Sequence, residues 1–141
     1  MEEMPHVDLL IGAVLLPGAR APKLIHRNML RQMKPGSVFV DIAIDQGGCA
    51  ETSRPTSHSD PVFEEEGIIH YCVTNMPGAY ARTATQALTN VTTPYAIKLA
   101  NLGWEGACRE LPELKLGLNV CEGKIVQETV AKALSKPYEA I

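Results

Sequence analysis

The fold is decided by the stretch Met33-Lys34-Pro35-Gly36-Ser37-Val38-Phe39-Val40-Asp41-Ile42-Ala43-Ile44-Asp45-Gln46-Gly47-Gly48. It opens with a turn signal, continues as a β-rich apolar run over residues 37–44, and ends at Asp45 and a pair of glycines. A continuous apolar run bounded by Pro and Gly predicts a strand buried on both faces, as in parallel sheets. Open α/β sheets bind ligands beyond the carboxyl ends of their strands. From position alone, Asp45 is therefore either a cap of the sheet end or a working group.

Two further apolar runs, residues 7–16 and 67–76, are also predicted as strands, and each is followed by Pro-Gly. A helix is expected over residues 21–33, with Pro22 in its first turn. Strand, helix and strand then form a βαβ unit with parallel strands and a right-handed crossover. If the three strands are neighbours, their end turns lie along one edge, where small residues let a ligand approach the backbone closely.

Residues 46–66 predict a long polar loop, of a length that is usually functional or disordered. Arg54 is the only Lys or Arg in this loop. Its side chain is either simply solvated or meets a phosphate or a ribose.

The second half of the chain predicts mainly helices. One helix runs from about residue 83 to 101 and stops at Asn101-Leu102-Gly103. A short helix follows over residues 104–110, in which Trp104 is expected to be a packing anchor. A small hairpin turning at Glu122-Gly123 and a final helix over residues 127–134 complete the pattern.

Composition excludes several classes of protein. The 141 residues carry a net charge of -3, which argues against nucleic acid as the main partner. No apolar run approaches the length of a membrane span. The four cysteines show no C-x-x-C pairing and the four histidines no ligand spacing, so no metal site is expected. Free thiols and a cytoplasmic location are expected instead.

A sheet of three parallel strands is thin, and no G-x-G-x-x-G phosphate-binding motif occurs in the chain. The residues therefore predict an α/β fold that forms one half of a doubly wound domain.

The sequence resembles alanine dehydrogenase over nearly its whole length. The most specific blocks are Asp45-Gln46-Gly47-Gly48-Cys49 and Asn75-Met76-Pro77-Gly78, and further blocks are Glu51-Thr52-Ser53-Arg54-Pro55-Thr56 and Lys115-Leu116-Gly117-Leu118-Asn119. The related NAD-binding subunit of proton-translocating transhydrogenase shares part of this pattern. The Asp45 block and the carboxy-terminal helices are more similar to alanine dehydrogenase.

The resemblance implies the second half of a Rossmann-type doubly wound parallel sheet, followed by helices that return to a substrate domain. Residues 1–81 would belong to the NAD-binding domain and residues 82–141 to the returning segment. The implied reaction is the reversible oxidative deamination of L-alanine to pyruvate and ammonia, with NAD as cofactor, in a homo-oligomer, a hexamer in the family. The family's glycine-rich loop, ribose-binding acid and catalytic Lys and His have no counterpart here, so we expect the carboxy-terminal part of the enzyme.

The resemblance also implies the site residues. Asp45 matches the catalytic aspartate, which would orient water or ammonia and stabilise charge at the imine stage. The positions that match cofactor contacts are Val14, Leu15, Ile42, Ala43, Ile44, Asp45, Arg54, Val73, Thr74, Asn75 and Met76. Two alternatives stay open: an inactive truncated scaffold or assembly module, and a transhydrogenase-like NAD-binding subunit.

Overall fold

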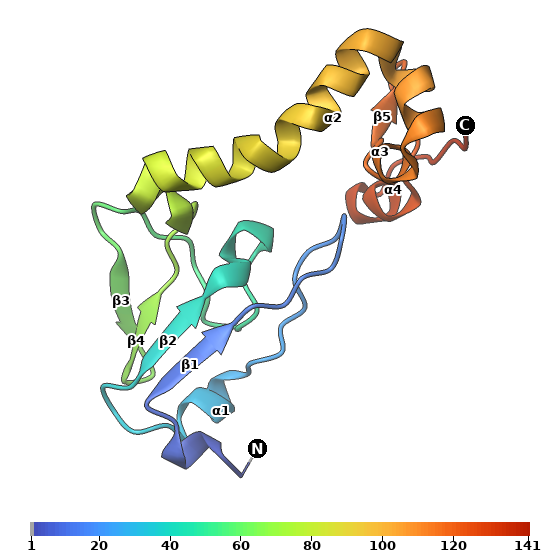
Figure 1. The fold of residues 1–141 in the computed structure, drawn as a ribbon. Coiled ribbons are helices and arrows are strands. Elements are labelled where there is room, and N and C mark those ends of the chain that lie inside the picture. Colours follow the sequence, from blue (N-terminus) through green and yellow to red (C-terminus); the bar gives the residue numbers. More distant parts are fainter. Residues whose placement is uncertain (1) are drawn as a thin grey trace. The chain divides into compact units, whose positions relative to one another are not determined.

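The computed structural model describes residues 2–141, which form two compact units that divide between Ala79 and Tyr80 (Figure 1). The first unit contains a four-stranded sheet, and the second is mainly helical. The assignment of residues 1–81 and 82–141 to the two domains of an enzyme stays a prediction.

The sheet of the first unit has the strand order β1-β2-β4-β3. Strands β1 (Leu9–Gly12), β2 (Val38–Asp41) and β4 (Ile68–Tyr71) are parallel, as predicted, with Leu10 opposite Phe39 and Phe39 opposite His70. Their arrowheads point the same way in Figure 1. The carboxyl ends of the three strands therefore share one edge of the sheet.

The edge strand β3 (Val62–Glu65) lies inside the segment predicted as a polar loop, and that prediction is wrong. It pairs antiparallel with β4 through a tight turn at Glu66 and Gly67, whose φ angles are 55° and 74°. Two successive left-handed residues are typical of the two-residue turns that join hairpin strands. Because β3 buries neither face fully, its sequence shows no continuous apolar run.

The expectation of strands buried on both faces is also wrong within this unit. Leu9 and Ile11 of β1 are 55% and 54% exposed, whereas Phe39 of β2 is fully buried. The sheet is covered on one face only in the part of the chain that the structure describes. The core on that face consists chiefly of Ile25, Leu30, Met33, Phe39, Cys49, Ala50 and Ile68.

The helix expected over residues 21–33 is reduced to α1 (Arg27–Leu30). Residues 21–25 are held in an extended path instead, because their backbone amides find partners in the segment after β2. The amide of Ala21 donates to the carbonyl of Gln46 at 2.9 Å, and that of Ile25 to the carbonyl of Cys49 at 3.0 Å. The amide of Arg27 then donates to the carboxylate of Glu51 at 2.9 Å, which caps the short helix.

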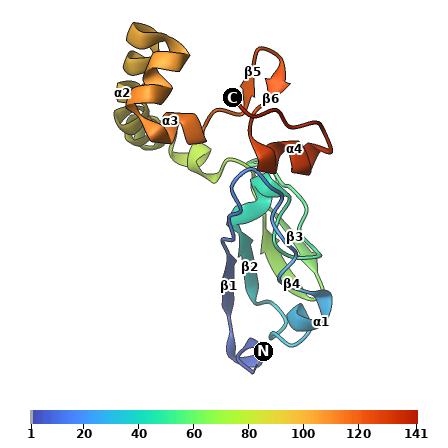
Figure 2. The same cartoon turned by 90° about the vertical axis from the view of Figure 1, so that its right-hand side faces the viewer.

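The second unit contains α2 (Ala81–Glu110), α3 (Pro112–Leu116), the hairpin of β5 (Val120–Cys121) and β6 (Lys124–Ile125), and α4 (Glu128–Leu134) (Figure 2). The predicted stop is confirmed at Gly103, whose φ of 66° and ψ of 173° break α2. The hairpin and the last helix are confirmed as well. No helix of residues 2–141 is both long and apolar enough to span a membrane.

The turn between β3 and β4 gives a pH-dependent prediction. Arg31 and, second, Arg27 hydrogen-bond to the Glu66 carboxylate and lower its pKa from an ordinary 4.5 to about 2. A depressed folded-state pKa stabilises the fold above the unfolded value, and this contribution is lost as the pH falls from about 4.5 to about 2. We expect the amide shifts of the folded turn to titrate with a midpoint near pH 2, the folded-state pKa of Glu66.

The titration is measured by NMR on the chain and on Glu66→Gln. Glu64→Gln on the same strand is the control, because Glu64 takes no part in the ion pairs of α1 with this turn. A turn that titrates near pH 4.5 in the parent would contradict the ion-pair geometry.

Candidate functional site

Strand β2 ends at Asp41, three residues before the predicted end at Ile44. The Asp41 side chain is fully buried and accepts hydrogen bonds from the amides of Ala43 (3.0 Å) and Cys49 (2.8 Å) and from the Ser53 hydroxyl. These bonds turn the chain from a strand into the 3₁₀ helix η2 (Ile42–Gln46). Asp45 therefore lies within η2, and the prediction that it directly follows a strand is wrong.

This arrangement separates the two possible roles of the acids in this stretch. Asp41 caps the end of the strand from the inside, with its carboxylate satisfied by backbone and hydroxyl donors. Asp45 is exposed and leaves its carboxylate toward solvent at the carboxyl edge of the sheet. Because Asp41 caps the end of the strand, Asp45 is not needed for that role.

Both glycines of the Asp-Gln-Gly-Gly-Cys block stand where a side chain would be strained or would clash. Gly47 ends η2 at a φ of 96°, in the left-handed region that favours glycine. A Cβ at Gly48 would clash with Ser53 and with the Asp41 carboxylate. Lys23 ties the same turn down by donating to the carbonyls of Gly47 and Gly48, at 2.7 and 2.9 Å.

A groove of about 380 Å³ opens where β1 and η2 leave the sheet. Its walls are largely apolar, and Leu15 and Ile42 are 67% and 53% exposed there. Its volume falls in the range of small-molecule sites. The groove is lined by Ala13, Val14, Leu15, Ile42, Ala43, Asp45 and Gln46. Five of these residues, all but Ala13 and Gln46, are among the site residues that the resemblance implies.

Gln46 is a residue that sequence reasoning missed. Its Oε1 atom is buried and has no hydrogen-bond partner among residues 2–141. A buried acceptor without a donor costs free energy, which a ligand carrying N–H groups would recover. Its position beside Asp45 in the named block was the only signal in the sequence.

The side chains of Ile44 and Val73 do not line the groove. They are 5% and 0% exposed, so each packs into the unit and offers a ligand only its backbone. Composition could not have named such positions as contacts.

The segment after β4 lies beside residues of the segment that is predicted as a polar loop. Thr56 forms a parallel bridge with Val73, and the amide of Thr74 donates to the carbonyl of Thr56 at 3.2 Å. Asn75 has a φ of 52°, and its carbonyl accepts a hydrogen bond from Nε2 of His58 at 3.0 Å. The predicted residues Thr74 and Asn75 are thus held at the carboxyl end of β4.

Arg54 lies in the adjoining segment and lines a second cavity of about 360 Å³, together with Pro55, Thr56, Ser57 and Asp60. The bridge from Thr56 to Val73 places this cavity beside the carboxyl end of β4. Polar groups therefore gather there, whereas the groove at β1 and η2 is apolar.

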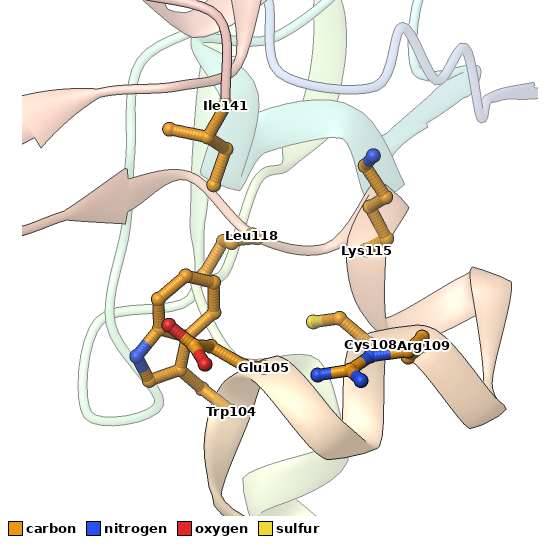
Figure 3. A pocket seen from close by; sticks show the side chains of 7 residues that line it. All are labelled: Trp104, Glu105, Cys108, Arg109, Lys115, Leu118 and Ile141. Atoms are coloured by element: carbon orange, nitrogen blue, oxygen red, sulfur yellow. The ribbon is translucent and has the colours of Figure 1, made fainter.

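A third cavity, of about 350 Å³, lies in the second unit between α2, α3 and the chain end (Figure 3). Trp104, expected as a packing anchor, is 40% exposed and lines it. The sulfur of Cys108 points into this cavity in Figure 3. None of the residues that line this cavity is among the site residues that the resemblance implies.

The four cysteines are free thiols, as expected. Cys49 and Cys72 are buried, whereas Cys108 and Cys121 are half-buried. Burial first, and then the nearby Asp41 carboxylate, raises the pKa of Cys49 and of Cys72 from 9.0 to about 11. Only about one in a thousand of these thiols is ionised at pH 8, and the thiolate is the nucleophile. We expect iodoacetamide to modify Cys108 and Cys121, which are half-buried, long before the other two.

Mass spectrometry of the native and urea-unfolded chain measures the sites of alkylation. All four cysteines should react in urea. Rapid modification of Cys49 in the native chain would contradict the burial of its thiol beside the Asp41 carboxylate.

A parallel sheet with an antiparallel edge strand, and a groove beyond its carboxyl ends, are typical of Rossmann-like α/β domains. The sequence model of the family described as "Alanine dehydrogenase/PNT, C-terminal domain" matches residues 1–128. The chain belongs to this family.

The curated relatives agree with the family. Alanine dehydrogenase of Halomonas elongata is 56% identical over 137 residues, and that of Mycolicibacterium smegmatis is 55% identical. Each match covers 97% of this chain and 37% of the relative, so the chain spans little more than a third of their length.

The solved structures separate the two branches of the family. A structure of L-alanine dehydrogenase aligns with a TM-score of 0.77 and 50% identity over 95% of this chain and 37% of that one. A transhydrogenase from Sinorhizobium meliloti aligns with a TM-score of 0.54 and 36% identity over 60% of this chain and 24% of that one.

Proposed function

We propose that this chain supplies the catalytic carboxylate and one half of the dinucleotide site of an alanine dehydrogenase. The reaction is the reversible oxidative deamination of L-alanine to pyruvate and ammonia, with NAD as the cofactor. The observation that carries the proposal is the groove at the carboxyl ends of β1 and β2, in which Asp45 is exposed while Asp41 caps the strand. The relatives named alanine dehydrogenase support the choice of substrate.

The lining of the groove supports the choice of a nicotinamide cofactor. Its exposed apolar walls suit a flat ring, and the unpartnered Oε1 of Gln46 suits an N–H donor such as a carboxamide. Bound NAD supplies hydride acceptance from alanine and hydride return to the imine. The residues that would hold it are Val14, Leu15, Ile42, Ala43, Ile44, Asp45, Arg54, Val73, Thr74, Asn75 and Met76.

Asp45 has the position and the chemistry for the polar part of the reaction. Its exposed carboxylate lines the apolar groove, so it can contact a bound substrate directly. In this role it orients the water or ammonia that attacks the substrate and stabilises the positive charge of the substrate imine.

The helix α2 supports assembly into a homo-oligomer, a hexamer in our proposal. Leu88, Val91 and Ile97 of α2 are 62%, 62% and 55% exposed. Apolar side chains gathered on one long helix are typical of surfaces that another chain covers. The four free thiols support a reducing compartment, the cytoplasm.

A chimera tests the function, because the chain spans 37% of its relatives. In it, this chain replaces the matching region of the Halomonas elongata enzyme. We expect NADH oxidation that requires both pyruvate and ammonia, at a rate within about tenfold of the parent enzyme.

The control is the same host with the region deleted, which should have no activity. A folded, NAD-binding chimera without turnover would favour the inactive scaffold. The transhydrogenase alternative has less support, because its structure matches over a smaller part of the chain with a lower TM-score.

A further inference from the structure

Arg54 is held by an aromatic ring and not by a carboxylate. Its guanidinium carbon lies 3.8 Å from the centroid of the Phe63 ring. Arg54 takes part in none of the ion pairs formed among residues 2–141. The cation–π contact engages the flat face of the guanidinium, so its N–H edge stays available for a ligand.

Phe63 is itself fixed from below. Its ring stacks on the imidazole of His70, with centroids 4.7 Å apart and an interplanar angle of 24°. His70 is fully buried, and its ring makes a T-shaped contact with Phe39, with the centroids 5.4 Å apart. Guanidinium, phenyl ring and imidazole therefore form one column that rises from the core to the surface.

Hydrogen bonds at both ring nitrogens fix the orientation of the His70 imidazole at the base of this column. Nδ1 of His70 donates to the carbonyl of Ile68 at 2.8 Å, so Nε2 accepts the hydroxyl proton of Thr52 at 2.8 Å. Thr52 lies two residues before Arg54. The segment that carries Arg54 is thus attached to the column both through Thr52 and through the guanidinium.

We propose that Phe63 is a positioning residue for Arg54 in the dinucleotide site: its ring holds the guanidinium so that the N–H edge meets a phosphate or ribose oxygen of the cofactor. The inference rests on the proposed function and extends it to a residue of β3. Arg54 lines the polar cavity beside the carboxyl end of β4. Because the ring already restricts the long side chain, binding loses less side-chain entropy.

The test measures KM for NAD and kcat in the alanine dehydrogenase chimera carrying Phe63→Leu. We expect KM for NAD to rise about three- to tenfold, with kcat within about twofold. Phe63→Tyr keeps the ring and should restore KM. The matched control is Val62→Ala, because Val62 precedes Phe63 on β3 and is 48% exposed.

A double-mutant cycle with Arg54→Met separates positioning from a merely structural role. If Phe63 acts through Arg54, Phe63→Leu has no further effect on KM in the Arg54→Met background. Equal effects of Phe63→Leu in both backgrounds, or an unchanged KM with a lowered Tm, would overturn the inference alone. An inactive parent chimera would overturn the proposed function and, with it, the inference that rests on it.

Discussion

Replacing Asp45 by Asn in the chimera is expected to lower kcat/KM for L-alanine by about 10²- to 10⁴-fold, the usual contribution of a positioned acid–base group. Asn keeps the size of the side chain but removes the charge that stabilises the imine and the capacity to accept a proton. Asp45 is exposed and does not cap β2, so the fold should tolerate the change. Steady-state kinetics in both directions, together with the Tm, measure the effect.

Asp8→Asn is the matched control. Asp8 precedes β1 at the opposite edge of the sheet, where its carboxylate forms only an exposed ion pair with Lys34. Its loss should leave kcat/KM unchanged. An Asp45→Asn enzyme that turned over like the parent would refute the catalytic role that we propose for Asp45.

Replacing Asp41 by Ala should destabilise the first unit by about 3–5 kcal/mol. The buried carboxylate accepts hydrogen bonds from two buried backbone amides and from the part-buried Ser53 hydroxyl, and Ala would leave both amides without an acceptor. Urea unfolding of the chain, followed by circular dichroism, gives the free energy of unfolding.

The same measurement on Asp8→Ala should show a loss of less than about 1 kcal/mol, because exposed ion pairs contribute little. A comparably small loss for Asp41→Ala would mean that the turn into η2 is maintained by other contacts. The account of the strand end would then be wrong.

The sequence predicts the parallel strands well because each apolar run is closed by a Pro or Gly signal. It fails for β3, where the strand covers only part of one face and two of its four residues are Glu. It fails again for residues 21–25, since the helical periodicity there is real but tertiary hydrogen bonds to Gln46 and Cys49 outcompete the helix. Pattern rules count local partners and cannot see these distant ones.

Some features of the candidate site could be predicted from the sequence, and others could not. The resemblance names Val14, Leu15, Ile42 and Asp45, and the structure places all four on one groove. The separate duties of Asp41 and Asp45 could not be assigned from the sequence, because both acids interrupt the same apolar run. The contact of Arg54 with Phe63 joins two residues of the segment predicted as a loop, and only the hairpin of β3 and β4 creates it.

The central claim is that the carboxyl edge of this sheet binds the dinucleotide. Hydrogen–deuterium exchange of the chimera, with and without NAD, tests it most directly. We predict slower exchange on adding NAD in residues 13–18, 42–48 and 73–79, and unchanged exchange around the cavity at residues 104–118. Protection that spares the first three segments while NAD is bound would contradict the account.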